Sequence, residues 1–128
     1  KVHSTNYIDT LIEVAEDTKV FQGNIPPTRD KKTIAEMNPY TYTSDELLFK
    51  IYADRNEVTE AEYQEAKNSF FSKGQACLRA SPLTKNYGFG IHSNHEGKIA
   101  LYGMETKEYF RFLHDVNIKK VKAMKSSK

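Results

Sequence analysis

Residues 86–103 read NYGFGIHSNHEGKIALYG and contain two strand-like runs, GFGIH and KIALY, on either side of a short polar segment. Asn94 and Gly97 are residue types that tolerate positive φ. We therefore interpret the polar segment as the four- or five-residue loop of a β-hairpin, and HSNH as its turn. His92 and His95 supply two metal ligands at most, and the sequence indicates no third, so no metal site is predicted.

The glycines of this stretch have a consequence for packing. Side chains alternate along a strand, so Gly88 and Gly90 share the face of His92, and Phe89 and Ile91 share the other face. Two glycines on one face leave space for a neighbouring aromatic ring or for a ligand. The sequence alone leaves both alternatives open.

Helices are predicted on either side of the hairpin. TEAE at 59–62 has the form of a capping box, apolar residues follow at helical spacing, and Gly74 is a natural stop, so a helix is expected over 60–73. ETKEYFRFLHDV at 105–116 predicts a second helix with an apolar stripe of Tyr109, Phe112, Leu113 and Val116. NIKKVKAM at 117–124 predicts a last strand.

The first half of the chain is less regular. YIDTLIEVA at 7–15 alternates and predicts a half-buried strand, and TIAE at 33–36 has the form of a capping box for a short helix. ELLFKIYADR at 46–55 fits a strand, or a helix behind a Ser44 cap. Its β-favouring Phe, Ile and Tyr residues favour the strand.

The predicted order is β–loop–α–β–α–β–β–β–α–β, in which consecutive strands are grouped apart from the helices. This order is typical of an α+β fold with a mainly antiparallel sheet and two or three helices on one face. The length of 128 residues predicts a single domain over 1–128, with a basic flexible tail at about 125–128.

Composition bounds the class of protein. No apolar run approaches the roughly 20 residues of a membrane helix, and acidic residues throughout KVHSTNYIDTLIEVAEDT argue against a secretory signal. The single cysteine, Cys77, cannot form an internal disulfide, which fits a reducing compartment. We expect a cytoplasmic protein that does not contact a membrane.

The net charge of +2 is unevenly distributed. Residues 1–64 hold 7 Lys and Arg against 12 Asp and Glu, a net of −5, and residues 65–128 hold 12 against 5, a net of +7. We expect the two halves to pack together and partly neutralise each other. The alternative is a basic face for phosphate or another acidic partner.

The candidate site lies just before the hairpin. An extended 76–80 would direct Cys77, Arg79 and Ser81 to one face, with Lys85, Tyr87 and His92 nearby. Such a group could hold a carboxylate or phosphate, with the Arg79 guanidinium as a bidentate donor. The competing interpretation is structural: a lone cysteine is most often a buried small apolar residue, and Arg79 could pair with an acid of the first half.

Two further functions stay open at this stage. Nearby cations could activate Cys77 as a nucleophile with His92 as its base, which would make the protein a small enzyme. The five lysines in IKKVKAMKSSK could contact nucleic acid, although they lack the interleaved arginines and aromatic residues that such surfaces carry. We expect no cofactor. A homo-oligomer formed through the tyrosine-rich 40–52 region also stays open.

Several long segments resemble one known family. The chain is similar to a family of short bacterial cytoplasmic proteins that is known as a domain of unknown function. The segments that carry this similarity are FFSKGQACLRASPLTKNYGFGIHSNHEGKIALYGMETKEY, HSTNYIDTLIEVAED, NPYTYTSDELLF and NIKKVKAM. The resemblance spans nearly the whole chain and implies a bacterial origin and a single domain. It implies no activity, cofactor or catalytic residue, so we expect a non-catalytic domain that binds a small anion or another protein.

Overall fold

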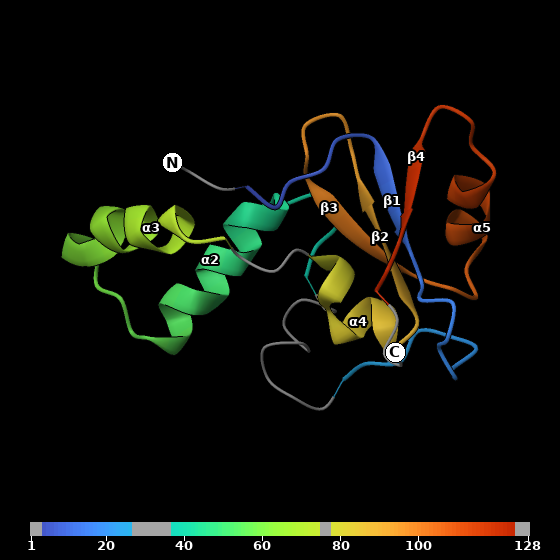
Figure 1. Cartoon of the computed structure of the whole chain (residues 1–128), viewed down its shortest axis with the longest axis horizontal. Coiled ribbons are helices and arrows are strands. Elements are labelled where there is room, and N and C mark those ends of the chain that lie inside the picture. Colours follow the sequence, from blue (N-terminus) through green and yellow to red (C-terminus); the bar gives the residue numbers. More distant parts are fainter. Residues whose placement is uncertain (1–3, 27–36, 75–77, 125–128) are drawn as a thin grey trace.

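The computed structural model describes residues 4–26, 37–74 and 78–124 (Figure 1). In chain order the elements, with η for 3-10 helices, are β1 (Thr10–Glu13), α2 (Ser44–Arg55), η1 (Glu60–Glu62), α3 (Tyr63–Ser72), η2 (Leu78–Ala80), α4 (Pro82–Lys85), β2 (Phe89–Ser93), β3 (Ile99–Gly103), α5 (Lys107–Leu113) and β4 (Lys119–Lys122). The helix predicted at 33–36 and the tail predicted at 125–128 lie outside the described residues.

The four strands form one sheet in the order β3-β2-β1-β4. β1 pairs with β2 and β2 with β3 in antiparallel fashion, and β4 lies parallel to β1. In this register Leu11 of β1 stands between His92 of β2 and Lys120 of β4. The α+β class, the mainly antiparallel sheet and the last strand are therefore confirmed.

The predicted hairpin is confirmed as β2 and β3. The Asn94 side-chain oxygen accepts hydrogen bonds from the amides of Glu96 and Lys98, at 2.9 and 3.0 Å, and Gly97 takes φ 79°. These contacts close the turn within the loop itself, and His95 is exposed there. The predicted turn is thus confirmed from Asn94 to Gly97, whereas His92 and Ser93 of the HSNH stretch are the last residues of β2.

An aromatic ring occupies the space above Gly90. A Cβ atom at this position would lie 2.2 Å from a ring carbon of Tyr109, so only glycine allows α5 to approach β2 this closely. The Tyr109 hydroxyl then accepts a hydrogen bond of 2.9 Å from the amide of Val14. Of the two alternatives for the glycine face, the aromatic ring is the correct one at this position.

The sheet is buried on both faces. Leu11 is 0% and Ile12 1% exposed, although the two side chains point to opposite faces, so the prediction of a half-buried β1 was wrong. On one face Ile12 packs with Leu78 of η2 and Leu83 of α4. On the other face Leu11 packs with Tyr109 of α5. Helices lie on both faces, whereas the sequence predicted them on one.

The strand predicted over 46–55 was wrong, because this segment is helix α2. Its N-cap is Thr43, not Ser44: the Thr43 hydroxyl accepts from the amide of Glu46, and the Glu46 carboxylate accepts from the amide of Thr43. Leu47 packs into the core against the sheet, and Phe49 packs on the other side toward α3. Because α2 is apolar on two sides, its sequence lacks the single stripe that marks an amphipathic helix.

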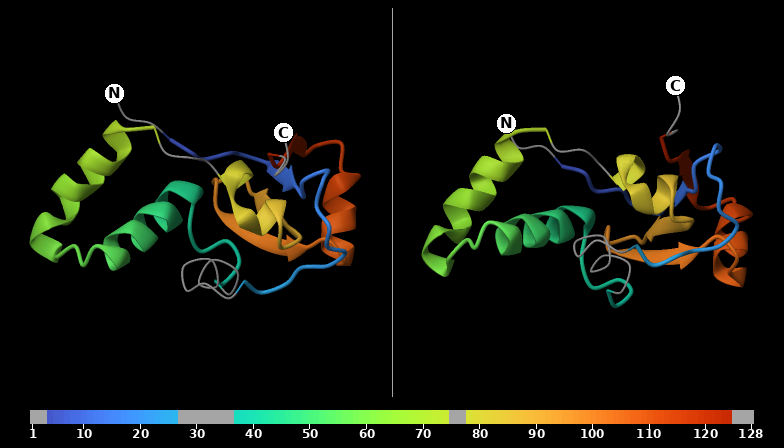
Figure 2. Two further views of the ribbon diagram at one scale, coloured as in Figure 1. Left: turned by 60° about the horizontal axis from the view of Figure 1, so that its bottom comes forward. Right: turned by 90° about the horizontal axis from the view of Figure 1, so that it is seen from below.

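α2, η1 and α3, residues 44–72, form a helical hairpin beside the sheet, here called the α2–α3 arm (Figure 2). The predicted helix over 60–73 is confirmed as η1 followed by α3. The N-terminal segment fixes the start of the arm, since the Asp45 carboxylate accepts from the Ser4 hydroxyl and from the Thr5 amide, both at 2.7 Å. These bonds position α2 against the sheet.

Candidate functional site

The predicted anion-binding surface depended on an extended segment at 76–80, and that premise was wrong. Residues Leu78–Ala80 form η2, and Arg79 and Ser81 therefore do not share a strand face. The Arg79 Nε atom donates to the Lys122 carbonyl at 2.7 Å, and the Met124 amide donates to the Arg79 carbonyl at 2.9 Å. Arg79 thus joins η2 to the end of β4.

The other residues of that surface have structural positions of their own. The Ser81 Oγ atom accepts from the amide of Leu83 at 3.1 Å and so caps α4, which ends at Lys85. The Tyr87 carbonyl accepts from the amide of Asn24 at 2.9 Å. These bonds hold the connection from η2 to β2, on the side of the sheet where Leu78 and Leu83 are buried.

His92 lies on the opposite face of the sheet. Its partner in the register is Leu11, and its ring is stacked on Phe112 of α5 with centroids 4.1 Å apart. The structure therefore separates His92 from Arg79, Ser81 and Lys85. Cys77 lies outside the described residues, so its role as a nucleophile stays a prediction.

His92 is the end of a chain of hydrogen bonds between side chains. Its Nδ1 atom is 2.7 Å from the Tyr40 hydroxyl, which is 3.0 Å from the Tyr102 hydroxyl. Burial lowers the pKa of His92, although Asp9 and Asp115 act in the opposite direction. Burial, and then the bond to Tyr102, raise the pKa of Tyr40. The neutral forms of His92 and Tyr40 are therefore favoured at neutral pH.

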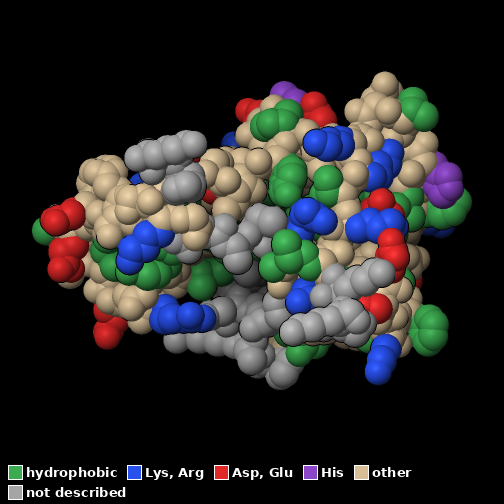
Figure 3. All heavy atoms as spheres, in the orientation of Figure 1, with side chains coloured by type: hydrophobic (Ala, Val, Ile, Leu, Met, Phe, Trp, Pro, Cys, Tyr) green, Lys and Arg blue, Asp and Glu red, His purple; other side chains and the backbone are tan. Residues whose placement is uncertain are grey.

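The basic second half meets acids of the first half. Parallel pairing of β1 and β4 brings Lys122 to Glu13, with Nζ and Oε1 3.3 Å apart, and Glu16 lies 3.9 Å from the same ammonium. Lys, Arg, Asp and Glu side chains are interspersed over the part of the molecule that holds the sheet (Figure 3). The expected mutual neutralisation is confirmed at this contact. Nucleic-acid binding through the basic half stays a prediction that the sequence does not favour.

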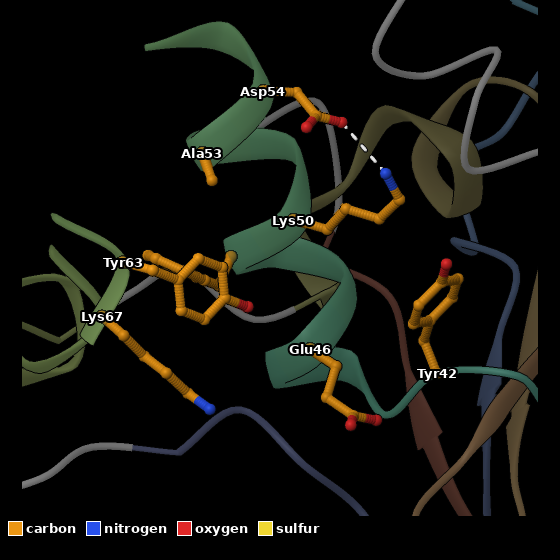
Figure 4. A pocket seen from close by; sticks show the side chains of 8 residues that line it. Tyr42, Glu46, Lys50, Ala53, Asp54, Tyr63 and Lys67 are labelled. Carbon is orange, nitrogen blue, oxygen red and sulfur yellow. Dashed lines mark hydrogen bonds and ion pairs between the residues drawn. The ribbon is translucent and has the colours of Figure 1, made fainter. Parts of the chain in front are cut away.

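A pocket that the sequence did not predict lies along α2 and is lined by residues of α2, of α3 and of the segment before α2. It has a volume of about 350 Å³, within the range of small-ligand sites. Its lining residues are Tyr42, Glu46, Phe49, Lys50, Ala53, Asp54, Tyr63 and Lys67. Tyr63 and Lys67 of α3 lie on one side of α2, and Tyr42, from the segment before α2, lies on the other (Figure 4).

The apolar part of the pocket is aromatic. Phe49 is 1% exposed and contacts Tyr63 edge-to-face, with ring centroids 5.0 Å apart. Phe70 and Phe71 pack behind Phe49 at 5.5 and 6.2 Å. Because these rings also hold α2 and α3 together, the wall of the pocket is part of the core of the arm. It is therefore formed before any ligand binds.

The charged groups of the pocket differ in how they are paired. Lys50 forms an ion pair with Asp54 at 3.1 Å, and the Asp54 carboxylate raises the pKa of Lys50. Glu46 is engaged in the capping box of α2. Lys67 is partly buried and forms no hydrogen bond or ion pair with any residue that the structure describes. The ammonium of Lys67 is thus the charge in this pocket that is available to a ligand.

Sequence reasoning missed this pocket because it assigned a strand to 46–55. The signal that could have found it is TSDE at 43–46, which has the same capping-box pattern as TEAE at 59–62. Two capped helices in succession would have predicted a helical hairpin with Phe49, Tyr63 and Lys67 near one another.

Two further properties bear on function. Within residues 4–26, 37–74 and 78–124, no three His, Cys, Asp or Glu side chains come together in a way that could hold a metal ion. No helix in the described part of the chain is long and apolar enough to cross a bilayer.

Comparison with known proteins gives one match. The sequence model described as "Family of unknown function (DUF6157)" matches residues 2–128. No curated protein and no solved structure matches the chain. Because no relative supplies an activity, ligand or partner, the pocket has to be interpreted from its own residues.

Proposed function

This chain belongs to DUF6157, a family of unknown function, and from its own residues we propose that it is a non-catalytic domain that binds a small organic anion in the α2–α3 pocket. The observation that carries this proposal is Lys67. Its ammonium lies at an aromatic pocket and has no partner among the described residues. A bound carboxylate would supply that partner.

The wall of the pocket defines the rest of the ligand. Phe49 and Tyr63 offer an apolar surface, and the volume of about 350 Å³ suits a molecule with one ring. The hydroxyls of Tyr42 and Tyr63 form no hydrogen bond with another described residue and are available as further donors. The ligand is therefore an amphipathic acid, with a flat apolar body and one anionic group.

Titration calorimetry with phenylacetate tests this proposal. Because Lys67 is partly solvated, the charge is worth about 1–2 kcal/mol, and we expect the neutral isostere phenylacetamide to bind roughly tenfold more weakly. Acetate, which has the charge and no ring, is expected not to bind measurably. Equal affinity for the acid and the amide would refute the role of the charge.

Lys67→Met keeps most of the aliphatic side chain and removes the ammonium, so it is expected to reduce phenylacetate affinity by about tenfold. The matched control is Lys73→Met, because Lys73 caps the end of α3 and does not line the pocket. Unchanged affinity in Lys67→Met, or the same loss in Lys73→Met, would contradict the proposal.

A further inference from the structure

The chain from Tyr40 to Thr43, here called the connecting segment, links the buried histidine to the pocket. Tyr40 contacts His92, Tyr42 lines the pocket and Thr43 caps α2. The segment lies along the edge of β3, where the Tyr40 amide donates to the Ile99 carbonyl at 2.8 Å and the Ile99 amide donates to the Tyr42 carbonyl at 2.9 Å. A change at His92 can therefore reach the pocket through one hydrogen bond to Tyr40 and the backbone from Tyr40 to Tyr42.

Tyr40 is held in an unfavourable backbone conformation. Its φ is +57°, in the left-handed region that a bulky residue seldom adopts. The surrounding contacts must offset that cost, and the bond to His92 is one of them. Weakening this contact therefore favours a different position of the connecting segment.

The protonation state of His92 limits the directions that these hydrogen bonds can take. In the neutral ring that carries its proton on Nε2, Nδ1 accepts from the Tyr40 hydroxyl, which can then accept from the Tyr102 hydroxyl. In the charged ring, Nδ1 donates, and the Tyr40 hydroxyl has to turn and donate to Tyr102. The distances allow both arrangements. The cost of protonation thus comes from the surroundings of the ring and not from a missing acceptor.

The surroundings of His92 solvate its protonated, positively charged ring poorly. The ring is 9% exposed, and Phe112 of α5 covers one side of it. Asp9, before β1, and Asp115, after α5, favour the charged ring. Lys120 of β4 lies in the same row of the sheet, with its ammonium held by the carbonyls of Asp115 and Ile118. Burial dominates, so the charged ring is more stable when it reaches water.

We propose that His92 is a pH-sensitive latch for the α2–α3 pocket: protonation of its ring loosens the connecting segment at Tyr40, displaces Tyr42 and weakens ligand binding. This regulation rests on the ligand-binding function proposed above. The latch acts on the pocket through Tyr42, because neither Tyr40 nor His92 lines the pocket.

An NMR titration of the ligand-free protein between pH 7.5 and 5.5 tests the latch independently of any ligand. The amide signals of Thr43 and Glu46 are expected to shift with the same midpoint as the His92 ring. In Tyr40→Phe, which retains the ring and removes the hydroxyl, the His92 ring still titrates and the two amides no longer follow it. Amides that ignore the His92 titration, or follow it equally in Tyr40→Phe, would overturn the latch.

Phenylacetate affinity over the same pH range tests the regulation. A loss of about threefold to tenfold is expected as His92 becomes charged, since tenfold corresponds to one unit between the pKa values of the bound and free states. Tyr40→Phe should flatten this profile, and His95→Gln, at the exposed hairpin turn, should preserve it. Coupled amides with pH-independent affinity would overturn the regulation. An absence of phenylacetate binding at every pH would overturn the proposed function, while the amide titration would still decide the latch.

Discussion

His92 shows how the environment of one side chain makes the stability of the protein depend on pH. The unfolded chain exposes this ring, with a pKa near its ordinary value of about 6.5, whereas burial lowers the pKa in the folded state. Below about pH 6.5 the unfolded state therefore binds more protons than the folded state. The free energy of unfolding contributed by His92 is fully present above that pH and decreases as the pH falls toward the folded pKa.

Urea unfolding at pH 7.5, 6.5 and 5.5 measures this effect. We expect the free energy of unfolding to decrease by about 0.5–1 kcal/mol over this range, because part of the charge is solvated even in the folded protein. His92→Gln should reduce the dependence of the free energy of unfolding on pH, and His95→Gln should leave this dependence unchanged. An unchanged or steeper dependence of the free energy of unfolding on pH in His92→Gln would contradict the assignment.

At the level of the element, α2 explains both what the sequence could predict and what it could not. Local patterns, such as alternation, a cap or a turn, specify five of the elements, namely β2, β3, α3, α5 and β4. α2 buries Leu47 on one side and Phe49 on the other, and its apolar residues fit a strand as well as a helix. Its capping box is the local signal that distinguishes the two, and the pocket requires α2 and α3 together.

The prediction for η2, which the sequence assigned to an extended segment, was wrong for a different reason. Three residues are too few to display a period, and their conformation depends on Leu78 in the core and on the bond from Arg79 to the end of β4. That bond joins positions 43 residues apart. This bond holds Arg79 on the face of the sheet opposite to His92, so the predicted grouping of Arg79 with His92 was wrong.

Removing the cap of α2 should destabilise the protein. Thr43→Ala deletes the hydroxyl that accepts from the Glu46 amide, and we expect a loss of about 1 kcal/mol in the free energy of unfolding, measured with urea. Thr43→Ser keeps the hydroxyl and should stay within about 0.5 kcal/mol of the natural protein. The same loss in both variants would assign the effect to the threonine methyl group.

The whole molecule consists of a sheet covered on both faces and an arm attached along α2. Among the described elements, α3 makes its main contacts with α2 and η1, whereas β1 is flanked by two strands and covered on both sides. Elements with few buried contacts open at a lower free energy than the global core. α3 is therefore expected to unfold locally while the sheet remains intact.

Native-state hydrogen exchange checks this expectation. Amides of 66–72 should exchange through an opening at least about 2 kcal/mol less costly than that of Ile12 and Ile91. A pocket ligand that bridges α2 and α3 should narrow this difference. Identical exchange free energies in α3 and in the sheet would show that the molecule opens as one unit.

The parallel pairing of β1 with β4 has a consequence for the time at which the protein folds. β1 is an interior strand whose second neighbour is made by residues 119–122. During synthesis, β1 leaves the ribosome about a hundred residues before the strand that completes its hydrogen bonding, at roughly 5–20 residues per second. The nascent chain thus carries an unpaired strand edge for several seconds. During this time we expect a ribosome-associated chaperone to bind the apolar segment that contains Leu11 and Ile12.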